Sequence, residues 1–214
     1  PITAVAERLA QHPQSPFMLV DAAQSFGQIP VQQAAAAADI YAFTGHKWCC
    51  GPEGLGGVAL SERVLEQSQP TVIGWRSLRN ENSSGSQWHH DGRRFEVATS
   101  CIPLGAGLRR SLDLLEELGD AQQREALICE RSARLWNGLQ QIPAVQTVVK
   151  EAPPASGLVS FTIDHTSAQA AVSALADQHF QLRSLEDPLC LRACTHVFST
   201  ESEIDQLLEA IGQL

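Results

Sequence analysis

The chain of 214 residues is long enough for one large or two small domains and can bury a substantial core. Its net charge of -9, with the basic residues scattered along the chain, argues against nucleic acid or an anionic membrane surface as a partner. No apolar run reaches the roughly 18 residues that a membrane span needs, and the first residues lack the layout of a signal peptide.

Short apolar runs that end in small or polar residues recur in the first half of the chain, and each is typical of a strand. We expect these strands at residues 17–23, 38–45 and 56–61. Apolar spacing predicts a helix before them at residues 2–11, and an Ala-rich stretch predicts a short helix at residues 31–39. Residues 74–96 are polar and aperiodic but hold two tryptophans, which favours a long functional loop or lid over a linker.

From Pro103 onward, longer amphipathic segments alternate with strands. Residues 104–119 predict a helix that ends at Gly119, and residues 120–142 predict a longer one capped by Asp120. The remaining expected elements are strands at residues 145–149, 157–163, 180–185 and 190–194 and helices at residues 167–178 and 201–214. This order predicts a compact α+β unit. We therefore expect an α/β chain with two domains, residues 1–119 and residues 120–214.

Two polar motifs directly follow expected strands of the first domain. One is D-A-A-Q, which begins at Asp21, and the other is T-G-H-K, which ends at Lys47. Ligands of open α/β sheets bind beyond the carboxyl ends of the strands. We therefore expect the two motifs to contribute to one binding site.

The residues in these motifs suit one cofactor. A lysine that forms a Schiff base needs apolar or aromatic neighbours that favour its uncharged form, and Lys47 lies between an apolar strand and Trp48. The Thr44 hydroxyl, the His46 ring and the amides of the following glycine-rich turn suit a phosphate. Asp21 can pair with a protonated ring nitrogen. A lysine, a phosphate cradle and such an acid are the groups that pyridoxal 5'-phosphate (PLP) requires.

The motif spacing also resembles a known family. The stretches DAAQSFGQIPV, ADIYAFTGHKWCCGPEGLGG, RRFEVATS and CLRACTHVFST run from Asp21 to Thr200 and resemble the class V aminotransferases, fold type I PLP enzymes that include the cysteine desulfurases. Within this family the motifs are most similar to those of the cyanobacterial cysteine/cystine C–S lyases.

The resemblance implies a fold and a missing partner. Residues 1–119 match the C-terminal part of a PLP-binding large domain, which has a mixed, mostly parallel sheet with helices. Residues 120–214 match the small C-terminal α+β domain. Family members carry a long segment before the first motif, so we expect a missing N-terminal segment of the same enzyme as a partner of this chain.

The resemblance assigns roles to the first-domain residues. Lys47 binds the cofactor as a Schiff base and then acts as the catalytic base. Asp21 holds the proton of the pyridine nitrogen, and Gln24 contacts the ring hydroxyl. Thr44 and His46 bind the phosphate.

Four further residues are candidates for the substrate and for the subunit interface. Thr99 matches a threonine that family members lend to the phosphate site of the other subunit, which implies a homodimer with a shared active site. Arg192 matches the arginine that holds the α-carboxylate of the amino-acid substrate. Arg183 competes for that role or serves the far carboxylate of cystine, and Trp75 is a further substrate-binding candidate. Thr99 as a helix cap and Arg192 as an ordinary ion-pair partner remain open alternatives.

The six cysteines do not indicate a metal site or a disulfide framework. Cys49 and Cys50 are adjacent, so they rarely both reach one ion with His46, and no C-x-x-C pair occurs. We therefore expect no metal, reduced thiols and a cytoplasmic location.

The expected reaction follows from the absence of a loop cysteine. Desulfurases use a cysteine on a mobile loop, and here that loop is shortened to SLEDP, with Cys190 beyond it in an apolar run typical of a buried strand. We therefore expect β-elimination on cystine or cysteine to give pyruvate, ammonia and persulfide or sulfide, which could supply iron–sulfur cluster assembly. Cystine is favoured because its persulfide leaving group is less basic than a thiolate. The alternatives are a cysteine desulfurase or another class V aminotransferase, and a non-catalytic fragment that needs its N-terminal half.

Overall fold

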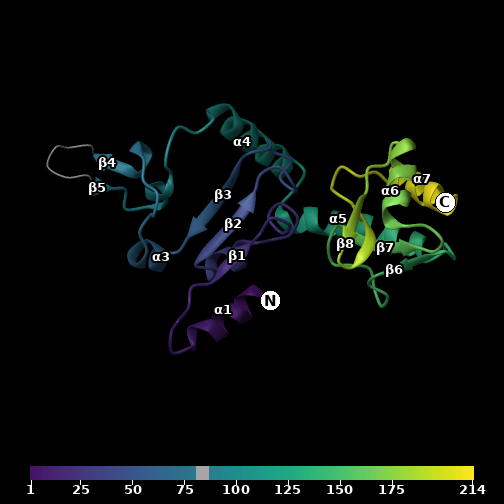
Figure 1. Ribbon diagram of the computed structural model, residues 1–214, viewed down its shortest axis with the longest axis horizontal. Coiled ribbons are helices and arrows are strands. Elements are labelled where there is room, and N and C mark those ends of the chain that lie inside the picture. Colours follow the sequence, from purple (N-terminus) through teal and green to yellow (C-terminus); the bar gives the residue numbers. More distant parts are fainter. Residues whose placement is uncertain (81–86) are drawn as a thin grey trace. The chain divides into compact units, whose positions relative to one another are not determined.

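The computed structural model describes residues 1–80 and 87–214 of the chain, which divide into two compact units, Pro1–Leu118 and Gly119–Leu214 (Figure 1). Among the helices of the described residues, none combines the length and the apolar character needed to cross a membrane.

A three-stranded mixed sheet with the order β1-β2-β3 organises the first unit. Its strands are β1 (Leu19–Asp21), β2 (Ile40–Thr44) and β3 (Gly56–Leu60). β1 pairs in parallel with β2, and β2 pairs antiparallel with β3. All three fall within the residue ranges expected from the sequence. Within the described residues, β1 and β3 each pair on one side only, so both outer edges of the sheet are open.

The helices of the first unit are α1 (Ile2–Ala10), α2 (Gln32–Ala37), α3 (Glu62–Gln67) and α4 (Ile102–Glu117). The Ala-rich segment does form the short helix α2, which connects β1 to β2. α3 was not expected from the sequence. It has six residues, and the Ser61 hydroxyl caps it by accepting a hydrogen bond from the Val64 amide at 3.3 Å. Helix α1 packs on α2 over a small core. The buried members of that core are Met18, Val20, Ala22, Ala38 and Tyr41.

The segment expected to be a long loop has more structure than its sequence indicated. It contains two 3-10 turns, η1 (Trp75–Ser77) and η2 (Gly92–Phe95), and a short antiparallel pair of strands, β4 (Leu78–Asn80) and β5 (Gln87–Trp88). Residues 81–86 of this segment lie outside the described residues. This pair of strands was not expected because each strand has only two or three residues, too few to show an alternating pattern.

The second unit is an α+β fold with a four-stranded antiparallel sheet in the order β6-β7-β9-β8. The strands are β6 (Val145–Thr147), β7 (Leu158–Ile163), β8 (Arg183–Glu186) and β9 (Leu189–Cys194), and the helices are α5 (Ala121–Leu139), α6 (Ala168–Asp177) and α7 (Glu201–Gly212). These elements match the expected order. The Asp120 side chain caps α5 by accepting from the Gln123 amide at 2.8 Å, as the sequence predicted.

Buried and partly exposed residues alternate along the central strand β7, and this pattern explains how the helices pack on the sheet. Val159, Phe161 and Ile163 are buried while the residues between them are partly exposed. The buried side packs with residues of α5, α6 and α7 in one continuous core. The helices therefore cover one face of the sheet, and the alternate residues of β7 and β9 lie on the other.

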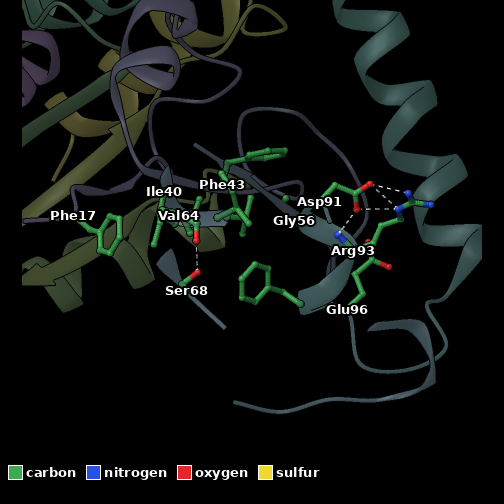
Figure 2. A pocket seen from close by; sticks show the side chains of 15 residues that line it. Phe17, Ile40, Phe43, Gly56, Val64, Ser68, Asp91, Arg93 and Glu96 are labelled. Atoms are coloured by element: carbon green, nitrogen blue, oxygen red, sulfur yellow. Dashed lines mark hydrogen bonds and ion pairs between the residues drawn. The ribbon is translucent and has the colours of Figure 1, made fainter. Parts of the chain in front are cut away.

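The first unit, in contrast, has a broad apolar hollow on its sheet, with a volume of about 980 Å³. Figure 2 shows Phe17, Ile40 and Val64 on one side of it and the Asp91–Arg93 ion pair on the other. The hollow is lined by β2, β3 and α3 together with η2. None of the residues that line it belongs to the two polar motifs, so this hollow is a different feature from the candidate site.

Candidate active site

The two polar motifs lie at the same edge of the sheet in the first unit. β1 and β2 are parallel, with Asp21 opposite Ala42, so both strands end on the same side. Asp21 is the last residue of β1 and Thr44 is the last residue of β2. Gln24 and Lys47 therefore follow strands that end side by side. The structure brings these candidate residues together as the strand-end rule predicts.

The segment that carries Lys47 is a closed loop anchored on helix α4. The Gly45 amide donates to the Leu55 carbonyl at 2.9 Å, and the Gly51 amide donates to the Gly45 carbonyl at 2.8 Å. From α4, the Ser111 hydroxyl donates to the Cys50 carbonyl at 3.0 Å. The backbone is thus fixed while the His46 and Lys47 side chains are exposed.

A close approach locks the two motif loops to each other. Gly27 has a φ of +89°, and a Cβ on it would lie 2.8 Å from the Trp48 carbonyl carbon and 2.9 Å from the Cys49 sulfur. Only glycine tolerates both the left-handed backbone and this contact. The D-A-A-Q loop consequently packs directly on the residues that follow Lys47.

Hydrogen bonds orient the side chains of the D-A-A-Q motif. The Asp21 carboxylate accepts from the Ala23 amide at 2.9 Å, which turns the chain after β1. The Trp48 indole N–H donates to Gln24 Oε1 at 2.9 Å, and the Gln28 side-chain amide donates to the Gln24 carbonyl at 2.6 Å. Gln24 is therefore held at both its backbone and its side chain.

Two polar groups at this edge have no partner within the described residues. The Thr44 hydroxyl oxygen is buried and makes no hydrogen bond there. The Gln24 Nε2 group donates to none of the described residues, although its oxygen is paired with Trp48. Buried polar atoms are rarely left unsatisfied in native proteins, so an orphaned hydroxyl beside an exposed lysine indicates a ligand. The residues present thus fit a phosphate-bearing aldehyde cofactor such as PLP.

Thr99 and Trp75 lie on segments that are joined to each other. Ser77, which is fully buried, accepts from the Gly74 amide at 3.1 Å and donates to the Glu96 carbonyl at 2.7 Å. This arrangement leaves both Trp75 and Thr99 exposed. The cap of α4 is Cys101, without a side-chain cap bond, so the alternative that Thr99 caps this helix is wrong.

The second unit presents Arg183 and Arg192 as direct cross-strand neighbours. They are Cα partners in the β8–β9 pair, and Ser160 of β7 is opposite Arg192 on its other side. The Arg192 Nε is buried and has no hydrogen-bond partner within the described residues. Like charges directly opposite each other destabilise a sheet unless an anion compensates them. This pair is therefore a candidate site for carboxylates.

No disulfide joins the cysteines of the described residues, and none of them lies in the connection between β8 and β9. β8 and β9 are joined by Asp187–Pro188 alone, with Glu186 paired to Leu189. Cys190 is buried as expected, whereas Cys194 is exposed. Near Lys47, burial raises the pKa of the Cys50 thiol, which disfavours the nucleophilic thiolate. Within the described residues, no cluster of histidine, cysteine and acidic side chains could hold a metal ion.

Comparison with known proteins identifies the family. The model of the family named aminotransferase class-V matches residues 1–207. The chain belongs to the class V aminotransferases.

Solved structures and curated relatives refine this membership. The complex between the cystine C–S lyase C-DES and its reaction product cysteine persulfide superimposes with a TM-score of 0.94 at 40% identity, covering 100% of this chain and 57% of that one. A C-DES mutant with glycine covalently linked to its PLP cofactor gives a TM-score of 0.94 at 39% identity, covering 100% of this chain and 56% of that one. A cysteine desulfurase of Haloferax volcanii is 28% identical over an alignment of 224 positions, which covers 99% of this chain and 51% of the relative. The chain spans about half the length of the curated relatives that it matches.

Trp48 makes a contact that its position in the sequence does not indicate. The sequence suggests only an aromatic neighbour of Lys47, yet Lys47 is exposed and the indole N–H is directed at Gln24. A possible signal was the indole itself, because a buried tryptophan needs an acceptor for its N–H. Which acceptor it finds depends on the fold of a loop more than twenty residues earlier, which no local pattern reveals.

Proposed function

We propose that this chain carries the lysine half-site of a PLP-dependent C–S lyase that performs β-elimination on cystine and cysteine. The observation that carries the proposal is the pairing of parallel strands β1 and β2, which brings Asp21, Gln24, Thr44 and Lys47 to one edge. The unpartnered Thr44 hydroxyl supports a phosphate at that edge.

Each residue has a stated task toward the cofactor. Lys47 provides the covalent anchor, and Asp21 holds the proton on the pyridine nitrogen. The Gln24 amide donates to the ring oxygen. The Thr44 hydroxyl and the His46 ring bind the phosphate, and Thr99 serves the phosphate site of a second copy in a homodimer. When bound, PLP supplies an electron sink for a carbanion at the substrate Cα.

With the cofactor in place, this chain would supply the group that moves the proton. The Lys47 amine would remove the α-proton of the substrate. The Cβ–S bond breaks, its electron pair leaves with sulfur, and hydrolysis of the remaining three-carbon unit gives pyruvate and ammonia. With cystine the leaving group is cysteine persulfide, and with cysteine it is sulfide.

The short β8–β9 connection favours elimination over desulfuration. A desulfurase needs a cysteine thiolate that reaches the substrate sulfur on a mobile loop, and here only Asp187–Pro188 joins the two strands. The 40% identity to the cystine C–S lyase C-DES supports the same choice. Cysteine desulfurase activity remains the second candidate, because the curated relatives include cysteine desulfurases.

The arginine pair supports an amino acid with carboxylate groups as the substrate. We propose that Arg192 binds the α-carboxylate through two parallel hydrogen bonds, a geometry that guanidinium provides. Its neighbour Arg183 serves the second carboxylate of cystine, which cysteine lacks. Trp75, which is 59% exposed, is a further contact for the substrate.

We also propose that activity requires a polypeptide corresponding to the other half of the relatives. Among the residues that the structure describes, both edges of the first sheet are unpaired, and Leu19 and Val58 are 64% and 59% exposed on it. An apolar hollow of about 980 Å³ lies on the same sheet. Such surfaces are normally covered in a stable protein. The chain paired with this complementary polypeptide is called the completed enzyme below, and we propose that it delivers sulfur to cytoplasmic iron–sulfur cluster assembly.

Product analysis of the completed enzyme tests this function. With cystine we expect pyruvate, ammonia and cysteine persulfide in equal amounts, whereas a desulfurase acting on cysteine yields alanine and an aminotransferase yields an exchanged amino group. A variant with all six cysteines replaced by serine or alanine should keep pyruvate formation within about tenfold of the parent, after correction for stability losses of roughly 1–2 kcal/mol at buried positions. Alanine as the main product, or complete loss of activity in a folded cysteine-free variant, favours the desulfurase.

A further inference from the structure

We propose that Trp48 is a positioning residue that fixes the orientation of the Gln24 amide, so that Gln24 presents a hydrogen-bond donor to the cofactor. The proposal rests on the function proposed above, in which Gln24 contacts the ring oxygen of PLP. It begins from the 2.9 Å hydrogen bond between the Trp48 indole N–H and Gln24 Oε1.

The hydrogen-bonding groups of the Trp48 indole and the Gln24 amide favour one orientation of that amide. An indole N–H can only donate, whereas a glutamine amide has one accepting end and one donating end. If the Gln24 amide turned over, its NH₂ group would face the indole N–H, and two donors would oppose each other. Trp48 is only 5% exposed, so water has little access to relieve that conflict. The contact therefore selects the orientation in which Nε2 points away from Trp48.

The surroundings hold both members of the contact in place. The Gln24 backbone carbonyl accepts from the side chain of Gln28, which is 4% exposed. The Trp48 backbone is held against Gly27, where no Cβ would fit. The amide is consequently restrained at its oxygen by Trp48 and at its backbone by Gln28, and within the described residues its Nε2 group has no acceptor.

A fixed donor favours an acceptor that carries negative charge. The ring oxygen of PLP would be such a group. A Gln24 donor fixed on that oxygen would stabilise its more negative form and so lower the pKa at which the bound cofactor loses a proton. Without Trp48 the amide turns freely, and part of the time it presents its oxygen to the ring oxygen.

The test is a pH titration of the visible absorption band of the cofactor in the completed enzyme, without substrate. Trp48→Phe and Trp48→Leu both remove the N–H, and either one carries the test if the other fails to fold. We expect the titration midpoint to rise by about half a pH unit in each, the size expected for partial loss of one hydrogen bond. Trp136→Phe is the matched control, because it removes an indole N–H that donates to the Val149 carbonyl in the second unit.

A double variant shows whether Trp48 acts through Gln24 or changes the site in general. In Gln24→Ala the midpoint should already be raised, and adding Trp48→Phe should change it no further, since Trp48 acts through Gln24. An unchanged midpoint in both single Trp48 variants, or an equal further rise in the Gln24→Ala background, overturns this inference while leaving the proposed function intact. Absence of any visible band in the parent overturns the proposed function and this inference with it.

Discussion

The two units of this chain differ in how completely each covers its own sheet. Within the described residues, the second unit joins fourteen buried apolar residues in one core, while the main cluster of the first unit has five. The first unit is nevertheless the longer one, Pro1–Leu118 against Gly119–Leu214. Its apolar residues instead lie at open sheet edges and around the hollow of Figure 2.

This difference places the proposed cofactor-binding residues in the unit with the smaller core. In the second unit, Phe161 and Leu191 face each other and pack with helices of the same unit. In the first unit, β1 and β3 offer unpaired backbone groups that a further polypeptide can pair with. The residues proposed to bind the cofactor thus belong to the unit whose sheet has unpaired outer strands, and we expect this unit to fold less well alone.

The largest expected effect is on folding of the separated units. Produced alone, residues 119–214 should unfold in one cooperative transition, because a single core spans the unit. Residues 1–118 should lack a cooperative transition and aggregate, and the 214-residue chain alone should be inactive and poorly soluble. Thermal unfolding, monitored by circular dichroism, measures the transition of each separate unit. Pyruvate formation measures the activity of the 214-residue chain.

Addition of the complementary polypeptide is the control for that comparison. It should give residues 1–118 a cooperative transition and leave the unfolding midpoint of residues 119–214 unchanged. Full activity of the 214-residue chain purified free of any other polypeptide would contradict the claim that the first unit needs a complementary polypeptide while the second does not.

The next effect concerns Arg192, which lies in the self-contained unit and should matter for activity alone. In the completed enzyme, Arg192→Lys should raise KM and lower kcat together, at a combined cost of roughly 3–5 kcal/mol, because lysine cannot make two parallel hydrogen bonds to a carboxylate. The visible cofactor band and the unfolding midpoint of the second unit should stay as in the parent. Steady-state kinetics with cystine and with cysteine measure the effect.

Arg183→Lys is the matched variant, because the two arginines are cross-strand partners. It should affect cystine more than cysteine, which has no second carboxylate. If Arg183→Lys instead fails on both substrates while Arg192→Lys behaves like the parent, the α-carboxylate has been assigned to the wrong arginine.

The smallest effect concerns the cap of α7 in the second unit. Thr200 accepts from the Glu203 amide at 3.2 Å, and the hydrogen bonds that Glu203 receives from Thr200 hold the pKa of this carboxyl below its usual range. A carboxyl with a lowered folded-state pKa stabilises the fold above its unfolded pKa of about 4.3, and that contribution is lost as the pH falls further. Thr200→Ala should lower the free energy of unfolding by about 1 kcal/mol near neutral pH. The variant should also lose less stability than the parent as the pH falls.

Ser167→Ala provides the comparison for that cap. The Ser167 hydroxyl accepts from the Ala170 amide at 3.2 Å at the start of α6, without a carboxyl in the contact. The stability loss of Ser167→Ala should therefore be nearly the same at every pH. Denaturant unfolding of residues 119–214 at several pH values separates the two variants, and equal pH dependence in both would contradict the role given to Glu203.

Much of the second unit could be predicted from its sequence because its elements are long and regularly patterned. The alternating β7 and the helix α5 capped by Asp120 follow directly from periodicity and capping. In the first unit, the D-A-A-Q and T-G-H-K motifs were placed correctly at neighbouring strand ends, because short apolar runs before them have few other uses. The six-residue helix α3 was missed, since a segment of that length shows hardly two turns of pattern.

Contacts between distant segments could not be predicted from local patterns. The hydrogen bond from Trp48 to Gln24 and the close approach at Gly27 depend on how two loops pack, not on the residues beside each in sequence. The same holds for Arg183 and Arg192, whose direct pairing is set by the register of the β8–β9 hairpin. Sequence spacing named these residues as candidates, and the strand register made them neighbours.

The central claim is that Lys47 anchors the cofactor, and covalent trapping tests it most directly. The chain has only two lysines, Lys47 and Lys150, so reduction of the PLP-loaded completed enzyme with borohydride, followed by peptide mass mapping, can yield one of two labelled peptides from this chain. We expect the pyridoxyl group on Lys47, with no label and a loss of activity of several orders of magnitude in Lys47→Ala, and no comparable loss in Lys150→Ala. A pyridoxyl group on Lys150, or an unlabelled chain that still forms pyruvate from cystine, would contradict the account.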